Sequence, residues 1–165
     1  MTQDIVNESL WQQFGASIEM LRNAIVMVPE EKWLSDKRFF KMSYHTLFFL
    51  DYYLTNPPKD FKPLLAFEFN DQGHIVPNKH YSKLEILEFL EACRSKCKKV
   101  CFSFNDENIA DRWIQTDNWP RNYQMFELMM YNMRHVQHHS AQMNMMLREL
   151  INDSPDWVSR ADGGD

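Results

Sequence analysis

Apolar residues recur at alternating steps of three and four in four stretches of the chain, which is the pattern of amphipathic helices. The first stretch covers residues 11–28, and Pro29 ends it because proline lacks the amide hydrogen that a continuing helix needs. The second stretch covers residues 40–54 and stops before the Asn-Pro-Pro sequence at 56–58. These two stretches predict two helices.

A long connection precedes the third predicted helix. Residues 57–81 contain prolines, a glycine and an Asn-Asp pair, so they favour turns over a helix. Ser82 suits an N-cap, and Glu85 follows three residues later, as in a capping box. A stripe of apolar residues then continues to Phe104 and predicts the third helix.

The last part of the chain predicts a second connection, a fourth helix and a tail. Residues 105–121 are mostly polar but include Trp113 and Trp119, which are expected to pack against the end of the helices or, alternatively, to wall a pocket. Residues 122–151 contain neither Gly nor Pro and predict the longest helix. Residues 153–165 form a tail whose last residues are expected to be mobile.

Four helical stripes without an alternating strand pattern predict an all-α fold, a four-helix bundle with a long crossover connection between its second and third helices. Residues 1–152 would form this single domain. A chain of 165 residues is long enough to bury one core, and 44% hydrophobic residues exclude a disordered chain.

Charge and targeting signals narrow the expected partners. Eighteen Lys and Arg against twenty-three Asp and Glu give a net charge of -5, and the basic residues are scattered, so nucleic acid is not an expected partner. The amino-terminal residues show no signal peptide, and no run of about 18 apolar residues occurs. We expect a cytoplasmic protein that does not enter membranes.

Three cysteines lie within one predicted helix, at Cys93, Cys97 and Cys101. An odd number of closely spaced cysteines is a poor layout for disulfides, so reduced thiols are expected. Steps of four keep them near one helical face, which would also suit a metal. Because Cys93 and Cys97 fall in the apolar row, we favour packing in the core.

The predicted last helix carries polar residues on the face that we take to be buried. This row consists of Leu128, Asn132, His135, His139, Gln142, Met146 and Leu150. His135 and His139 are four residues apart, so their Cβ atoms lie about 6 Å from each other and both imidazoles could bind one ion. The alternatives are a hydrogen-bonded core histidine or two histidines on a solvated face.

A third histidine is available on the predicted second helix, where His45 shares a face with Phe49 and Tyr52. Three imidazoles with one open position, for water or a substrate thiolate, are typical of a catalytic rather than a structural metal site. A di-iron carboxylate site would need Glu three residues before each helix-four histidine, but Asn132 and Val136 stand there.

The stretch from His135 to Gln142, His-Val-Gln-His-His-Ser-Ala-Gln, resembles the fourth-helix signature of the DinB-like metal-binding four-helix bundles. In that family a histidine of the second helix joins two histidines spaced four apart on the fourth. Members often have Arg-Gly where this chain has Ser140 and Ala141. The resemblance covers the chain from the first helix to residue 151.

This resemblance implies a divalent transition metal, zinc or nickel, on His45, His135 and His139. The activities in the family are diverse, and some members resemble thiol-dependent transferases and isomerases. A small-molecule substrate, including a thiol, is therefore expected, and the resemblance to dimeric bundles makes a homodimer an expected assembly.

Other polar residues near the predicted site are open to more than one interpretation. His138 points about 100° away from its neighbour in the row, so a surface position or a contact behind a ligand is expected. Gln142 either orients a ligand or lies at the bundle end. His74 and His80 belong to the long connection and are expected to be solvated. Asp51 turns away from the face of His45 and is expected to be a surface carboxylate.

Two functions from different classes fit these residues. One is a metal-dependent enzyme, a hydrolase or a thiol-dependent transferase, with the ion on the three histidines. The other is a non-enzymatic bundle that binds a small ligand or a partner helix, with a structural or incidental metal. Neither a Ser-His-Asp arrangement nor a phosphate-binding glycine loop is evident. No catalytic residue is assigned from the sequence.

Overall fold

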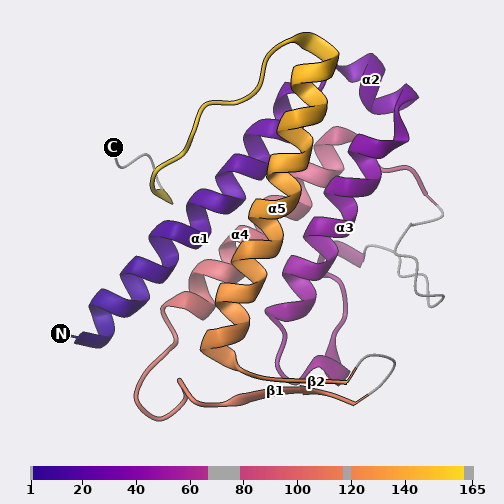
Figure 1. Ribbon diagram of the computed structural model, residues 1–165. Coiled ribbons are helices and arrows are strands. Elements are labelled where there is room, and N and C mark those ends of the chain that lie inside the picture. Colours follow the sequence, from indigo (N-terminus) through magenta and orange to yellow (C-terminus); the bar gives the residue numbers. More distant parts are fainter. Residues whose placement is uncertain (1, 67–78, 117–119, 162–165) are drawn as a thin grey trace.

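Four long helices form a bundle in the computed structural model, which describes residues 2–66, 79–116 and 120–161 (Figure 1). The long helices are α1 (Thr2–Met27), α3 (Lys37–Tyr53), α4 (Lys83–Cys101) and α5 (Met125–Ile151). The shorter elements are α2 (Glu30–Ser35), the 3-10 turns Pro58–Asp60 and Leu64–Ala66, and the strands β1 (Arg112–Gln115) and β2 (Arg121–Gln124). The predicted all-α four-helix bundle is confirmed.

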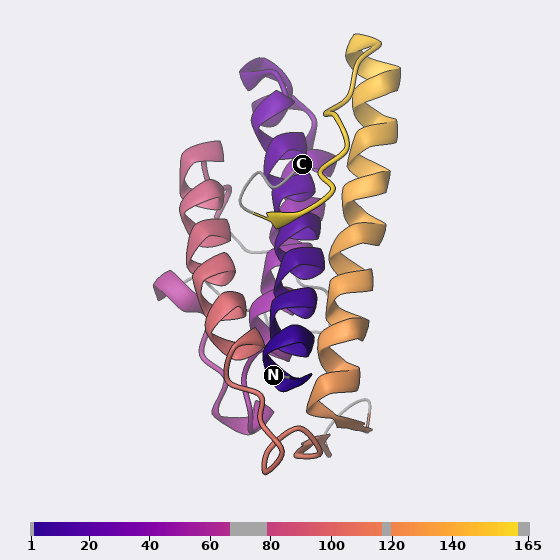
Figure 2. The ribbon, with the colours of Figure 1, turned by 90° about the vertical axis from the view of Figure 1, so that its left-hand side faces the viewer.

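Around the bundle, α1 packs against α4 and α5, and α3 packs against the same two helices on the other side (Figure 2). In Figure 1, α1 and α5 run upward, whereas α3 and α4 run downward. The pair α3 and α5 is therefore antiparallel and in direct contact. Part of the connection from α3 to α4 lies outside the described residues, as does His74, so the long crossover stays a prediction.

The core contains large aromatic side chains from α1, α3 and α4 and from the connections, and aliphatic and methionine side chains from α5. Trp11, Phe14, Phe39, Phe89 and Leu128 are each no more than 1% exposed. Burial of each such side chain contributes roughly 1.5–3 kcal/mol. Cys93, Cys97 and Cys101 are also fully buried and unpaired by disulfides, which confirms their predicted place in the core. Within the described ranges, no helix combines the length and apolar character needed to cross a membrane.

The structure adds two elements that the hydrophobic pattern did not predict. The short helix α2 follows Pro29 and inserts Trp33 into the core, where the indole Nε1–H donates to the Tyr81 carbonyl at 3.1 Å. The antiparallel hairpin of β1 and β2 pairs Trp113 with Tyr123. Because β2 occupies residues 121–124, the last helix begins at Met125 rather than at residue 122.

The first helix begins at Thr2, nine residues before the predicted start at residue 11, whereas the other predicted ends lie close to those observed. The capping box at Ser82 and Glu85 is present, with the Glu85 amide donating to the Ser82 hydroxyl at 3.2 Å. Trp113 is fully buried and donates from Nε1 to the Thr55 carbonyl at 2.8 Å, so it packs at the bundle end as predicted. Trp119 lies outside the described residues.

The segment after α5 turns back and lies along α1 (Figure 2). The Val158 amide donates to the Met20 sulfur at 3.2 Å, and Ala161 is only 2% exposed. Ala161 lies so close to Gly15 that a Cβ atom on that glycine would stand 2.6 Å from the Ala161 Cβ atom. The predicted mobility concerns the last residues of the tail, and 162–165 are not among those described.

Asp51 corrects a prediction, because it is fully buried rather than on the surface. Its carboxylate accepts from the Lys96 ammonium at 2.6 Å and from the Leu64 amide at 2.8 Å. The surface position was predicted because Asp51 points away from His45, which was taken as the centre of the buried face. His45 lies at the edge of that face, so a residue that points away from it can still be buried. Asp51 instead points from α3 towards α4, where it bonds to Lys96 and to the Leu64 amide within the connection.

Candidate metal centre

The site lies on the line where α3 and α5 meet, at the border between core and solvent. On α5 the fully buried residues near the site are Asn132, Val136, Ser140 and Met143. His135 and His139 lie beside this row and are half-buried. The predicted inward row is therefore wrong beyond Asn132. It continued by a step of three to His135, whereas the buried row continues by steps of four to Val136 and Ser140.

On α3 the histidine likewise lies beside the fully buried row and not within it. Tyr44, Leu47 and Phe48 are buried, whereas His45 and Phe49 are only half-buried. Two half-buried faces, one on each helix, thus meet along the α3 and α5 contact. Because neither face is fully enclosed, side chains there can contact both the core and a molecule from solvent.

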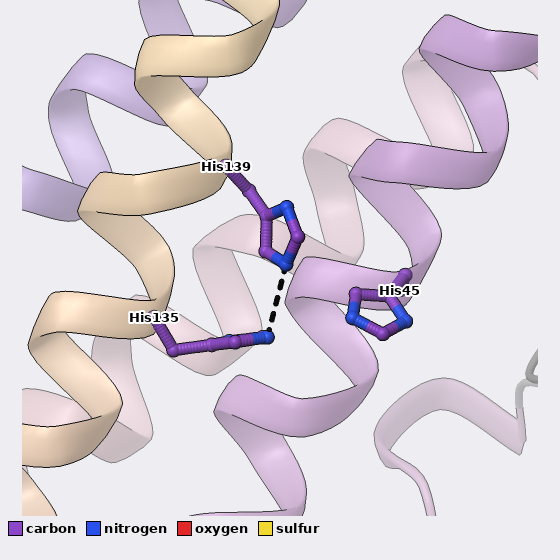
Figure 3. A group of neighbouring side chains, drawn as sticks. All are labelled: His45, His135 and His139. Atoms are coloured by element: carbon purple, nitrogen blue, oxygen red, sulfur yellow. Dashed lines mark hydrogen bonds between the residues drawn. The ribbon is translucent and has the colours of Figure 1, made fainter.

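The three predicted histidines come together at this border (Figure 3). His135 and His139 project from α5 towards His45 on α3, and their ligand atoms all lie within 4.8 Å of one another. The two Nε2 atoms of His135 and His139 are 3.1 Å apart. The ring of His45 is centred 4.9 Å from that of His139 and 5.4 Å from that of His135.

These distances suit one ion shared by the three rings. Two imidazole nitrogens bound at 2.0–2.1 Å to a tetrahedral ion are separated by about 3.3 Å. The two α5 histidines already lie near this separation, and His45 brings a third nitrogen to within 4.8 Å of both. The described residues thus form a cluster that is compatible with a metal site.

The electrostatic environment keeps the three imidazoles neutral, which is the form that binds metals. Burial, with a smaller effect of His139, lowers the pKa of His45 to about 4. Burial, helped by the neighbouring histidines and by Arg121, lowers the pKa of His135 to about 3. Burial also lowers the pKa of His139, against the opposing effect of its hydrogen bond to Gln142.

Gln142 determines which nitrogen of His139 faces the cluster. Nδ1 of His139 lies 2.7 Å from Oε1 of Gln142, so the protonated Nδ1 donates to this oxygen and leaves the lone pair on Nε2. Nε2 is the atom that faces His135. The side chain of Gln142 is exposed, and it contacts the ring of His139 from the solvent side.

His135 carries an unmet hydrogen-bonding group. Its Nδ1 atom is buried and has no hydrogen-bond partner among the described residues, and the same is true of Oδ1 of Asn132, one helical turn earlier. Because Nε2 of His139 holds a lone pair, Nε2 of His135 donates to it at 3.1 Å, and an ion bound between them would require that hydrogen to move to Nδ1 of His135. The donor set therefore fits an ion bound through Nε2 of both α5 histidines.

The remaining predicted residues lie outside the cluster. His138 is exposed, with its ring centred 5.1 Å from that of His139. His80 is exposed and contacts the ring of Phe40 at 4.3 Å between centroids. The three cysteines are fully buried on α4 and are not among the residues of the cluster. Burial also raises the pKa of Cys93 and of Cys97 well above the ordinary value for a thiol.

Three residues beside the cluster were not identified from the sequence. They are Tyr53, Arg121 and Tyr131, whereas Phe49 was predicted to share the face of His45. The ring of Phe49 contacts both His45 and His135, at 4.9 and 5.6 Å between centroids. A signal was available on each helix, because Phe49 and Tyr53 follow His45 at steps of four and Tyr131 precedes His135 by four.

The fold and the site together define the class as a four-helix bundle with a three-histidine cluster between two antiparallel helices. The model of the DinB family matches residues 64–156, more than half of the chain, and the chain therefore belongs to the DinB family. Comparison with curated proteins gives no significant match. Comparison with solved structures gives none either. The matched region contains His135 and His139 but begins after His45.

Proposed function

We propose that this protein is a metal-dependent enzyme, a hydrolase or a thiol-dependent transferase, that holds a divalent transition metal on His45, His135 and His139. The observation that carries the proposal is the meeting of three neutral imidazoles within 4.8 Å at a half-exposed position. Imidazole donors suit zinc and nickel. When bound, the ion would supply Lewis-acid chemistry that lowers the pKa of a water or a thiol.

The protein's own residues provide the arrangement that such chemistry needs. His135 and His139 hold their nitrogens at a fixed separation because both project from the rigid helix α5. His45 approaches from α3, so all three ligands lie on the protein side of the site. The described residues supply three ligands only, and half-exposure leaves the opposite side accessible to a small molecule.

Gln142 and Phe49 complete the surroundings of the cluster. Gln142 holds the His139 ring in one orientation through Nδ1. Phe49 covers the cluster on the side away from Gln142 and contacts both helices' histidines. Apolar cover of this kind excludes water from one side and keeps the imidazoles neutral.

Elemental mass spectrometry on tag-free protein, purified without chelator or nickel resin, tests the metal site. We expect about one equivalent of a transition metal in the wild type and in His138→Ala, a matched change on the same helix. The double variant His135→Ala, His139→Ala is expected to lose it. Absence of metal from the wild type, even after reconstitution with zinc or nickel, would contradict the proposal and favour the non-enzymatic bundle.

A second measurement separates an enzyme from a structural site. The His139→Ala variant of an enzyme should lose turnover in screens with hydrolase and thiol-transfer substrates while it stays folded at the assay temperature. A structural metal predicts instead that the variant unfolds at that temperature when it loses the ion, and that the wild type has no turnover to lose.

A further inference from the structure

The three histidines belong to two longer rows of rings that face each other across the α3 and α5 contact. The row on α3 consists of His45, Phe49 and Tyr53, and the row on α5 consists of Tyr131, His135 and His139. Within each row the residues are four apart, so they lie on one side of their helix. Because the helices are antiparallel, the histidines meet at one end of the rows and the two tyrosines at the other.

Ring contacts connect the histidine end to the tyrosine end without a gap. The centroid of Tyr53 lies 6.3 Å from that of His135 and 5.3 Å from that of Tyr131. Phe49 contacts Tyr53 at 5.5 Å and His135 at 5.6 Å. A small molecule that lies along these rows would therefore touch aromatic surface from the proposed ion to the tyrosines.

Arg121, from strand β2, closes the tyrosine end. Its Nη1 atom donates to the Tyr53 hydroxyl at 2.5 Å and lies 3.4 Å from the Tyr131 hydroxyl. Its guanidinium carbon lies 5.7 Å from the centroid of each of these two rings. These contacts hold the plane of the guanidinium in place against the ends of both helices.

Among the described residues, no carboxylate pairs with the guanidinium, although a partly buried cation normally has such a partner. Within the described part of the chain, the two hydrogen bonds of Arg121 to side chains both come from Nη1. A guanidinium carries five N–H donors, so the Nε and Nη2 hydrogens remain available. The two tyrosine hydroxyls that accept from Arg121 also share a hydrogen bond with each other, so one hydroxyl hydrogen of the pair remains free to donate.

This group of donors matches a carboxylate. The planar fork of arginine binds the two oxygens of a carboxylate through parallel hydrogen bonds, and a tyrosine hydroxyl adds a third donor. Aromatic surface between the guanidinium and the histidines suits the apolar middle of a small molecule. The arrangement therefore favours a ligand that is anionic at one end and metal-binding at the other.

We propose that Arg121, with the hydroxyls of Tyr53 and Tyr131, binds the carboxylate of a small-molecule substrate whose other end reaches the three histidines. This inference rests on the proposed metal site and adds the charge of the substrate and its direction along the α3 and α5 contact. Arg121 acts in recognition, at a distance from the reacting atoms.

The cobalt-substituted protein offers a direct readout, because a thiolate bound to cobalt gives a strong near-ultraviolet absorption band. Thioglycolate, 3-mercaptopropionate and longer homologues would be titrated beside uncharged thiols of the same length, such as 2-mercaptoethanol. We expect at least one carboxylate homologue to bind about tenfold or more tightly than its uncharged counterpart, a typical effect of a charge-assisted contact. The homologue that binds best reports the span from the ion to Arg121.

Matched variants assign the preference to this residue. Arg121→Met is expected to remove the carboxylate preference and leave the dissociation constant of the uncharged thiol unchanged. Arg112→Met, on strand β1 of the same hairpin, is the control and should keep the preference, because Arg112 is exposed and, among the described residues, its side chain bonds to Asn122 alone. Tyr131→Phe should reduce the preference severalfold while it keeps the ring.

The outcomes separate the two proposals. Equal binding of charged and uncharged thiols, or a preference that survives in Arg121→Met, would overturn the role of Arg121 and leave the metal site intact. A cobalt spectrum that no thiol changes would instead overturn the open metal site on which this inference rests. Should Arg121→Met fail to fold, Arg121→Lys and Tyr131→Phe decide, and an undiminished preference in both would overturn the proposal.

Discussion

Gln142 shows how one exposed side chain can set the metal-binding form of its neighbour. Its Oε1 atom accepts from Nδ1 of His139 and directs the lone pair of Nε2 towards the cluster. Changing Gln142→Ala should therefore weaken metal binding by about 10- to 100-fold, the usual effect of losing a residue that orients a ligand. Competition with a chromophoric chelator measures this change.

Gln137→Ala is the matched control for that experiment. Gln137 lies on the same helix but lines a hollow of about 190 Å³ beside Trp157, on the side that faces α1 and the tail. Its loss should leave metal affinity unchanged. Equal effects of the two substitutions would show that Gln142 does not act through His139.

The metal-free protein should lose stability as the pH falls from about 6.5 to about 4. The folded state lowers the pKa of His45 to about 4 and that of His135 to about 3, whereas in the unfolded chain both titrate near 6.5. Below pH 6.5 the unfolded state therefore binds more protons, and unfolding becomes easier until the folded imidazoles are protonated too. Above about pH 6.5 the effect is absent.

Melting curves of the chelator-treated protein between pH 7.5 and 4 test this expectation. The variant His45→Gln, His135→Gln should show a smaller decrease of melting temperature over the same range, because two of the responsible groups are gone. An identical pH dependence in both proteins would place the titrating groups elsewhere.

Spacing marked His135 and His139 as a candidate pair and offered His45 as a third ligand, but it left a core or solvated position open for them. The resemblance to the DinB-like bundles implied that the three histidines meet, and neither signal showed which neighbours share their environment. Arg121 was not predicted because its position depends on a hairpin whose strands lack a clear alternating pattern. Asp51 was placed on the surface because the centre of the buried face on α3 cannot be located from one histidine.

At the scale of elements, the pair of Asp51 and Lys96 joins α3 to α4 and to the connection between them. Asp51 is fully buried, and the side chain of Lys96 is 26% exposed. Asp51→Asn should destabilise the protein by about 3 kcal/mol, because the substitution leaves the ammonium without its carboxylate partner in a largely buried position. Chemical denaturation measures the change in the free energy of unfolding.

Glu91→Gln provides the comparison, since it breaks the exposed ion pair of Arg22 and Glu91 between α1 and α4. Such a pair contributes about 1 kcal/mol or less. A loss in Asp51→Asn no larger than that in Glu91→Gln would mean that the buried pair does not fix α3 to α4.

The long helices were predictable because each carries an apolar stripe that extends over several turns, and prolines mark the ends of the first two. The short elements were not. A helix of one or two turns such as α2 has too few residues to show a period, and it forms because Trp33 is buried and bonds to Tyr81 from a distant part of the chain. The register of β1 and β2 likewise depends on the burial of Trp113.

At the scale of the whole molecule, the segment after α5 is attached to α1 through a close contact with Gly15. A Cβ atom at this position would lie 2.6 Å from Ala161 and 3.1 Å from the ring of Trp11. Gly15→Ala should therefore displace the segment and cost about 1–3 kcal/mol. Hydrogen exchange should become faster at the Val158 amide, which now donates to the sulfur of Met20.

The same substitution in a chain that ends at residue 152 is the control. Without Ala161 most of the clash is gone, and alanine favours a helix over glycine by up to about 1 kcal/mol. Gly15→Ala should then be much less destabilising than in the full chain. An equal cost in both chains would show that the contact with Trp11, not the tail, is responsible.

The order of helices around the bundle could not be predicted from the sequence, because every amphipathic helix has the same kind of apolar stripe. Only the structure shows that α5 lies between α1 and α3. The residues matched to the DinB family include His135 and His139. His45 lies before the matched residues and comes close to the other two because α3 contacts α5.

Because the three histidines are divided between α3 and α5, the site can exist only after these two helices have met. During synthesis His45 leaves the ribosome well before His135, so an ion cannot be captured until the last long helix has been made and has folded onto the bundle. Binding of an ion would then be one of the last steps of folding, and it would stabilise only the completed bundle. An ion present at a hundred times its dissociation constant would favour the completed fold by about 2.7 kcal/mol.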